Sequence, residues 1–319
     1  MLRGTSYGID IKALCIVLYF EYRVTENKII NFFKQFGITM SAGTLSNIII
    51  KEKAEIFKEE KSAIYGAGLN STIYQQTDDT GFRFDGQNWY MQVVCNPYYS
   101  AYFINERKNR DTAKEVLLNG HDELVFDIVL SDDAGQFKKI ADHNALCWIH
   151  EYRHYKKIKV VFKIHSGILN NFKGQIKLYY DKLKEYKERP TESFKKELSA
   201  EFDKMFGTPT GYDVLDERNK LTMKKKEELL LVLDFPELPL HNNLSEGELR
   251  EEVVKRKISF GTRTEEGSSA WENHFTILAT CKKMGVNYYD YIKDIFSGKR
   301  KMPRLADLIK KASQMQLQT

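Results

Sequence analysis

The spacing of apolar residues changes twice along the chain, and these changes limit the folds that it can adopt. Residues 9–70 carry apolar side chains three and four positions apart, which is typical of helices. From about residue 72 to residue 149, short runs either alternate between apolar and polar or are continuously apolar, which indicates strands. Helical spacing returns over residues 166–235. The pattern therefore predicts an α/β protein whose strands lie between two helical regions.

Length and composition support a folded protein with a sizeable core. The chain has 319 residues, which suggests about two domains, and 42% of them are hydrophobic. The longest apolar run, at residues 13–20, is too short for a membrane span of about 18 residues. Asp10 and Lys12 interrupt the segment where a signal peptide would need an apolar core. The four cysteines form no CxxC pair, which disfavours a disulfide scaffold and fits a reducing cytoplasm. We expect no membrane partner.

The N-terminal region contains two helices in the spacing of a helix-turn-helix. Thr25 is a suitable N-cap for a helix that Gly37 would end, and Ser41 can cap the next helix. Such a pair either contacts DNA or packs as an ordinary part of a helical region, and the sequence leaves both interpretations open.

The order of the predicted elements resembles a ribonuclease-H-like fold. Strands are expected at residues 73–78, 89–95, 99–104, 125–130 and 145–149, and helices at residues 111–118 and 136–142. We expect turns at Gly81 and at Asp85–Gly86, and a later helix capped by Ser268 or Ser269. The predicted fold is a mixed five-stranded sheet flanked by helices, with an all-α insertion before the last catalytic helix. The predicted segments are an N-terminal helical region (1–70), the first part of the core (71–165), the insertion (166–235), the last part of the core (236–290) and a basic helical tail (291–319).

Three carboxylates in this order suit metal-dependent chemistry on phosphodiesters. Asp78 is predicted at the end of the first strand, Asp132 follows the buried fourth strand, and Glu246 lies near the start of a helix. Mg²⁺ prefers carboxylate oxygens, and two such ions about 4 Å apart can activate a nucleophile and stabilise charge on the phosphate. Acidic residues are also common after strands, so position alone is weak evidence. Asp79 and Asp133 stand beside two of the candidates, and strand alternation does not say which of each pair faces a metal.

Four sequence blocks resemble the insertion sequence 66 family of bacterial DDE transposases. The longest block begins at Pro239 and reads P-L-H-N-N-L-S-E-G-E-L-R, followed by a basic helix, a G-T turn and E-E-G. The other blocks are T-D-D-T-G-F from Thr77, S-D from Ser131, and C-W-I-H with a later arginine from Cys147. The resemblance extends from about Leu2 to Tyr291.

The resemblance implies a role for each matching residue. It gives Asp78, Asp132 and Glu246 as the catalytic and metal-binding carboxylates, which would hold two Mg²⁺ or Mn²⁺ ions. Asp79 and Asp133 replace the family's usual glutamate and glycine. Residues in supporting positions are Asp79, Asp133, His241, Asn242, Asn243 and Arg250. Residues in DNA-binding positions are His150, Arg153, Lys255, Arg256, Lys257 and Arg263.

Several of these residues also have structural interpretations. Asn242 and Asn243 can cap the helix that follows them instead of contacting DNA. His241 either binds phosphate or a metal ligand, or packs as a structural histidine. Cys147 and His150 lack a second Cys/His pair at suitable spacing, so zinc is disfavoured and a buried Cys147 is expected.

The predicted activity is metal-dependent cleavage and strand transfer of DNA by a bacterial transposase. The expected partners are double-stranded DNA at element ends and targets, a second copy or a larger assembly on DNA, and accessory proteins of the element, in the cytoplasm at the nucleoid. The net charge of +5 is small, but basic residues cluster around residue 256 and near the C-terminus. The alternatives are a non-catalytic DNA-binding or assembly protein derived from a transposase, and a structure-specific nuclease of the same fold.

Overall fold

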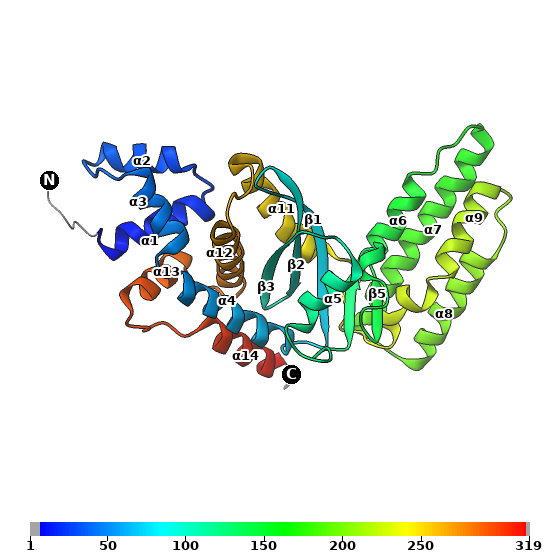
Figure 1. Cartoon of the computed structure of the whole chain (residues 1–319). Coiled ribbons are helices and arrows are strands. Elements are labelled where there is room, and N and C mark those ends of the chain that lie inside the picture. The colour runs from blue at the N-terminus through cyan, green and yellow to red at the C-terminus, as the bar shows by residue number, and fades with distance from the viewer. Residues whose placement is uncertain (1–6, 317–319) are drawn as a thin grey trace. The chain divides into compact units, whose positions relative to one another are not determined.

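The computed structural model describes residues 7–316, and the chain divides into two compact units (Figure 1). Unit 1 comprises Met1–Phe126 and Leu244–Thr319, and unit 2 comprises Asp127–Asn243. The predicted segments 1–70 and 291–319 and the start of the family resemblance include residues outside the described range, at 1–6 and 317–319. In the described part of the chain, no helix combines the length and the apolar character that crossing a bilayer requires.

Unit 1 contains a three-stranded antiparallel meander, and unit 2 contains a parallel pair of strands. The strands of unit 1 are β1 (Tyr74–Phe84), β2 (Gln87–Asn96) and β3 (Tyr99–Asn105). Those of unit 2 are β4 (Ile128–Ser131), which is fully buried, and β5 (His143–Leu146). The strand order is β3-β2-β1-β4-β5. The predicted α/β class with a five-stranded mixed sheet is therefore confirmed.

The first strand is longer than the sequence predicts. Asp78 lies in the middle of β1, opposite Val93 of β2, and Gly81 continues the strand instead of turning. The prediction that Asp78 ends this strand is therefore wrong. The reversal occurs at Asp85 and Gly86, whose φ angles are 45° and 75°. These left-handed conformations match the two-residue hairpin turn that the Asp-Gly pair predicts.

Side chains of helix α12 (Glu265–Lys283) accept hydrogen bonds from the backbone of the edge strand β3. Backbone N–H groups of alternate β3 residues donate to α12 side-chain oxygens: Ile104 to Glu272 at 2.6 Å, Tyr102 to Thr276 at 3.2 Å, and Ser100 to Thr280 at 3.5 Å. Four helical residues rise about 6 Å and two strand residues rise about 6.6 Å, so the two repeats nearly coincide. The helix thereby covers an edge that would otherwise expose unpaired donors.

Helix α11 (Asn243–Ser259) is joined to the end of β1 through a tight turn. The backbone N–H of Thr262 donates to the Arg83 carbonyl at 3.1 Å, and that of Asp85 donates to the Thr262 carbonyl at 2.8 Å. Gly261 has a φ of 91°, and a Cβ atom there would lie 2.0 Å from the Arg83 carbonyl oxygen. Only glycine fits this position without moving the backbone.

Helices at both ends of the chain complete unit 1. They are α1 (Ile9–Phe20), α2 (Glu26–Gln35), α3 (Ala42–Ser46), a π-helical turn (Asn47–Lys51), α4 (Ala54–Leu69), α5 (Arg110–Leu118), α13 (Tyr288–Ser297) and α14 (Leu305–Gln316). Ser41 caps α3 by accepting from the Thr44 N–H at 3.1 Å, as predicted. Thr264 caps α12, so the prediction of Ser268 or Ser269 is wrong. Within this unit, α4 and α14 lie side by side (Figure 1).

The helical part of unit 2 begins earlier than the sequence predicts. Its helices are α6 (Trp148–Lys156), α7 (Lys163–Glu188), α8 (Glu192–Gly207), α9 (Asp213–Met223) and α10 (Lys226–Leu229), with a 3-10 turn at Leu231–Leu233. The predicted strand at residues 145–149 ends at Leu146, because Trp148 and Tyr155 are buried two helical turns apart on α6. The helix predicted at residues 136–142 is only a 3-10 turn at Gly135–Phe137.

Replacing Gly261 with alanine tests the turn after α11. The left-handed φ and the contact with the Arg83 carbonyl predict that Gly261→Ala lowers the free energy of unfolding by about 3 kcal/mol. Gly285→Ala is the matched control, since Gly285 also has a positive φ of 66° but open space around it. Gly285→Ala should lower the free energy of unfolding by only about 1–2 kcal/mol. Urea unfolding measures both, and equal losses would contradict the proposed close contact.

Candidate functional site

The first acidic pair lies in the middle of β1. Asp78 is half-buried, and its Oδ1 accepts a hydrogen bond from the Asp79 backbone N–H at 2.8 Å. The Asp79 side chain forms an ion pair with Lys108 at 2.5 Å. Because successive strand residues point to opposite faces, Asp78 and Asp79 face different sides of the sheet. The Asp79 carboxylate therefore pairs with Lys108 on the face of the sheet opposite to Asp78.

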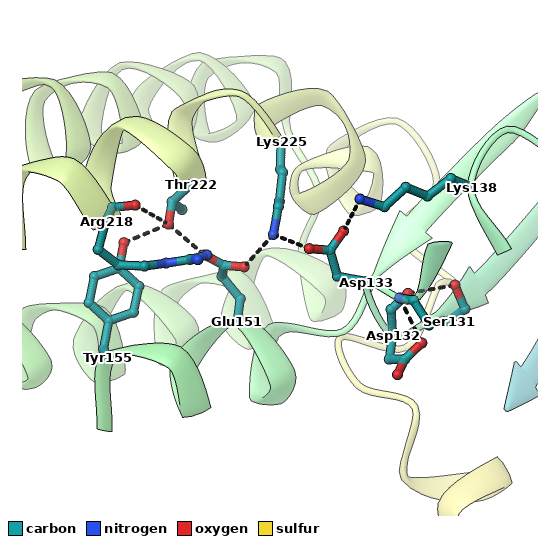
Figure 2. Close-up of polar contacts among 10 residues, drawn as sticks. Ser131, Asp132, Asp133, Lys138, Glu151, Tyr155, Arg218, Thr222 and Lys225 are labelled. Atoms are coloured by element: carbon teal, nitrogen blue, oxygen red, sulfur yellow. Dashed lines mark hydrogen bonds and ion pairs between the residues drawn. The ribbon is translucent and has the colours of Figure 1, made fainter. Parts of the chain in front are cut away.

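The second pair follows β4 in unit 2 (Figure 2). Asp132 Oδ1 accepts from the Ala134 backbone N–H at 3.0 Å, which fixes the direction of this carboxylate in a short turn. Asp133 is held by Lys225 at 2.5 Å and by Lys138 at 3.0 Å. Burial alone would raise the pKa of Asp133, but hydrogen bonds from the two lysines outweigh it and hold this pKa below its ordinary value.

The third candidate lies in the first turn of α11. Glu246 is half-buried there, two residues before a second glutamate. Glu248 Oε2 accepts a hydrogen bond from the Tyr102 hydroxyl at 2.8 Å, and its Oε1 pairs with Lys283 at 3.3 Å. These contacts tie the start of α11 to β3 and to the end of α12.

A lysine therefore binds the acidic neighbour of every predicted metal ligand. The three neighbours are Asp79, Asp133 and Glu248. Each of these ion pairs neutralises a carboxylate beside a predicted ligand and fixes the position of its side chain.

A chain of ion pairs connects the end of β4 with α6 and α9 (Figure 2). Lys225 also lies 3.3 Å from Glu151, which accepts a hydrogen bond from Thr222 at 2.5 Å and pairs with Arg218. Glu151 is only 4% exposed. Burial would raise its pKa, but the hydrogen bonds from Thr222 and Arg218 and the charge of Lys225 outweigh it, so the pKa of Glu151 is lowered. Sequence reasoning missed this network, because 74 residues separate Glu151 from Lys225 and no local pattern links them.

Two of the four sequence blocks meet within unit 2. The Trp148 backbone N–H donates to the Leu240 carbonyl at 3.0 Å, and the Asn242 backbone N–H donates to Cys147 Sγ at 3.2 Å. Cys147 is buried, as predicted. Asn242 is fully buried immediately before α11, Asn243 is exposed as the first residue of that helix, and His241 is half-buried. In α6, His150 Nε2 lies 2.8 Å from the Arg153 guanidinium.

The three predicted ligands do not fall in one unit. Asp78 and Glu246 belong to unit 1, and Asp132 belongs to unit 2. Among residues 7–316, the structure shows no group of three or more His, Cys, Asp or Glu side chains arranged to hold a metal ion.

The basic residues of α11 and the following turn are not all accessible. Arg250, Lys257 and Arg263 are exposed, and Arg256 is half-buried. Lys255 is fully buried, and its Nζ lies 3.3 Å from the centroid of the Tyr19 ring. The prediction that Lys255 binds DNA is therefore wrong for this structure.

The sequence does not predict the burial of Lys255. It lies at helical spacing from Ser245, Leu249 and Glu252, the other buried residues of α11, but Leu249 is the one apolar residue among them, so no apolar stripe marks this face. Burial lowers the pKa of Lys255 to about 7 and raises the pKa of Glu252 to about 8.

Residues 4–270 match the family described as Transposase IS66 family. The chain belongs to this family. An uncharacterized protein, y4jO from Sinorhizobium fredii (strain NBRC 101917 / NGR234), is 35% identical over 167 residues. That match covers 52% of this chain and about half, 51%, of the relative.

The raised pKa of Glu252 predicts a pH dependence of stability. Between pH 5 and 7 the unfolded chain has released the proton of Glu252 while the folded chain keeps it. The free energy of unfolding therefore falls as pH rises, by about 1.4 kcal/mol per unit. Lys255 adds almost no slope below about pH 6, because it is charged in both states there. Near pH 7 the folded chain begins to lose this proton while the unfolded chain keeps it, which partly offsets the slope from Glu252. Glu252→Gln should remove this slope.

Glu251→Gln is the control, since the Glu251 side chain is 48% exposed on the same helix. Urea unfolding at pH 5, 6 and 7 compares the two variants with the wild type. If the three proteins show the same pH dependence, Glu252 does not titrate as the structure predicts.

Proposed function

We propose that this protein is a DDE transposase that cleaves DNA at element ends and joins the resulting 3′-hydroxyl to target DNA by transesterification. Asp78, Asp132 and Glu246 would act as the metal-binding catalytic carboxylates. The observation that carries this assignment is the match of residues 4–270 to the transposase family, since all three carboxylates lie within the matched range. The lysine pairing of Asp79, Asp133 and Glu248 agrees with supporting roles for these neighbours.

The donor set fits divalent magnesium or manganese. All three residues offer carboxylate oxygens, which are the ligands that these hard cations prefer. When bound, a pair of such ions would lower the pKa of a water or 3′-hydroxyl and stabilise charge on the phosphate. Asp132 contributes a side chain whose direction is already set by the Ala134 N–H. Asp78 is set similarly by the N–H of Asp79.

The ribonuclease-H-like form of the fold belongs to the same proposal. The strand order β3-β2-β1-β4-β5 and the parallel pairing of β4 with β5 support it. In this interpretation, the helices α7 to α10 of unit 2 correspond to the predicted insertion at residues 166–235, which precedes the glutamate helix α11.

Exposed cations would bring DNA to the site. Arg250, Lys257 and Arg263 lie on α11 and the turn that follows it, where they would neutralise phosphates, with Arg256 beside them. We further propose that the protein acts as a dimer or a larger assembly on double-stranded DNA, with accessory proteins of the element, at the bacterial nucleoid.

Matched variants test the assignment of the carboxylates. Labelled DNA carrying the ends of the element that encodes this chain is incubated with the protein and Mn²⁺, and nicked and joined products are separated on denaturing gels. Asp78→Asn, Asp132→Ala and Glu246→Ala should each reduce the rate at least 100-fold, because a lost metal ligand removes charge stabilisation in the transition state.

The controls are Asp79→Asn, Asp133→Asn and Glu248→Gln, which should each reduce the rate by about 10-fold and less than the ligand variants do, since they alter only supporting contacts. Equal activity of Asp132→Ala, Glu246→Ala and the wild type would reject the proposal. DNA binding without cleavage by the wild type would indicate a non-catalytic protein, and cleavage without joining would indicate a nuclease.

A further inference from the structure

A pocket of about 470 Å³ lies between α6 and α7 of unit 2. Trp148 and Ile176, which are 2% and 3% exposed, form its apolar floor. The Trp148 indole N–H donates to the Leu229 carbonyl at 2.8 Å, so the ring is fixed in place. The volume falls within the range of about 300–1,000 Å³ that is typical of small-molecule sites. The pocket therefore has a volume suited to a single nucleotide above a closely packed apolar base.

Two tyrosines form the walls of this pocket. Tyr152 comes from α6 and Tyr180 from α7, and both are half-buried. Lys156 Nζ lies 5.0 Å and Lys177 Nζ 6.0 Å from the centroid of the Tyr152 ring. Both lysine side chains are exposed and long enough to move from the ring to a bound anion.

The lining is cationic. Arg153, Lys156 and Lys177 contribute positive charges, and the acidic side chain of the lining, Asp181, is paired with Lys184 at 2.8 Å. Aromatic faces combined with cations are the features that bind single-stranded nucleic acid, where bases stack on rings and the backbone follows positive charge. Bases in a duplex are stacked on each other, so they present edges and phosphates but no free ring face to an aromatic side chain.

We propose that the pocket between α6 and α7 binds one unpaired nucleotide of a DNA strand, with its base stacked on Tyr152 and its phosphate held by Lys156 and Lys177. The naming of DNA as the polymer rests on the proposed function. The pocket floor is also joined to the segment before α11, because the Trp148 backbone N–H donates to the Leu240 carbonyl. The site is thus built on two of the sequence blocks that characterise the chain, and it would hold a strand end that has separated from its partner.

A comparison of single-stranded and duplex DNA binding distinguishes base stacking on the tyrosines from charge attraction to the phosphates. Fluorescence anisotropy is measured on the full chain with a labelled 20-nucleotide strand and with its duplex, in EDTA, where no metal-dependent cleavage occurs. Tyr152→Leu should weaken binding of the single strand by about fivefold or more, and Tyr180→Leu by a similar factor, with less than a twofold effect on the duplex. Tyr152→Phe should stay within twofold of the wild type, because it keeps the ring.

Charge variants complete the test. Lys177→Gln should weaken both DNA forms and reduce the salt dependence of binding, whereas Lys196→Gln, an exposed lysine of α8 outside the pocket, should do so less. Ultraviolet cross-linking of a strand that carries 5-iodouracil should label Tyr152 or Tyr180. The proposal is overturned if the Tyr→Leu variants bind the single strand like the wild type, or if they weaken both DNA forms equally. A melting temperature close to that of the wild type confirms that each variant is folded.

The outcome is independent of the catalytic proposal. Binding is measured in EDTA, so this readout does not require the proposed metal ligands. If strand cleavage fails but the tyrosine variants lose single-strand binding, the pocket stands and the catalytic assignment falls. If the wild type cleaves DNA but the tyrosine variants bind the single strand normally, the proposed nucleotide site is rejected and the catalytic assignment is kept.

Discussion

The pairing of acidic side chains with lysines is the interaction on which the account of the site depends. Carboxylates that gather in a partly buried region repel one another and lose hydration, so they need cations nearby. In this chain Lys108, Lys225 and Lys283 each bind the acidic neighbour of a proposed metal ligand. The lysines neutralise the neighbours and anchor them. The same sequence blocks therefore contain both a positioning carboxylate and a proposed catalytic one.

Within unit 1, backbone hydrogen bonds connect the helix that carries Glu246 to the strand that carries Asp78. The turn at Gly261 and Thr262 bonds to Arg83 and Asp85 at the end of β1, while Glu248 is held by Tyr102 of β3. Helix α12 in turn covers the β3 edge with oxygens at the matching repeat. Within unit 2, the network from Asp133 through Lys225 to Glu151 connects the end of β4 with α6, one of the two helices that line the pocket.

Local chemistry in the sequence predicted much of the fold. The Asp85–Gly86 turn, the Ser41 cap and the buried strand before Asp132 could be read from a few neighbouring residues, and the structure contains all three. The continuation of β1 through Gly81 and the Thr264 cap were missed, because tertiary contacts and competing capping residues decide them. The metal-ligand assignment came from the family resemblance and remains a prediction.

The sequence could not have shown which lysine pairs with which carboxylate near the proposed site. Lys225 and Lys283 lie far from Asp133 and Glu248 in the chain, so no spacing rule links them. The burial of Lys255 was hidden for a related reason, because the buried stripe of α11 consists of Ser245, Leu249, Glu252 and Lys255 and carries a single apolar residue. Exposure of a basic residue in a helix is decided by the face on which it lies rather than by its charge.

Mapping the metal site by iron-mediated cleavage of the polypeptide tests the central claim most directly. Fe²⁺ takes the place of Mg²⁺ at carboxylate sites, and with ascorbate and peroxide it generates radicals that cut the backbone close to the metal ion. The account predicts cuts near residues 78, 132 and 246 in the same preparation, suppressed by excess Mg²⁺ and lost in Asp132→Ala. Cuts that avoid these three segments, or that persist unchanged in Asp132→Ala, would contradict it.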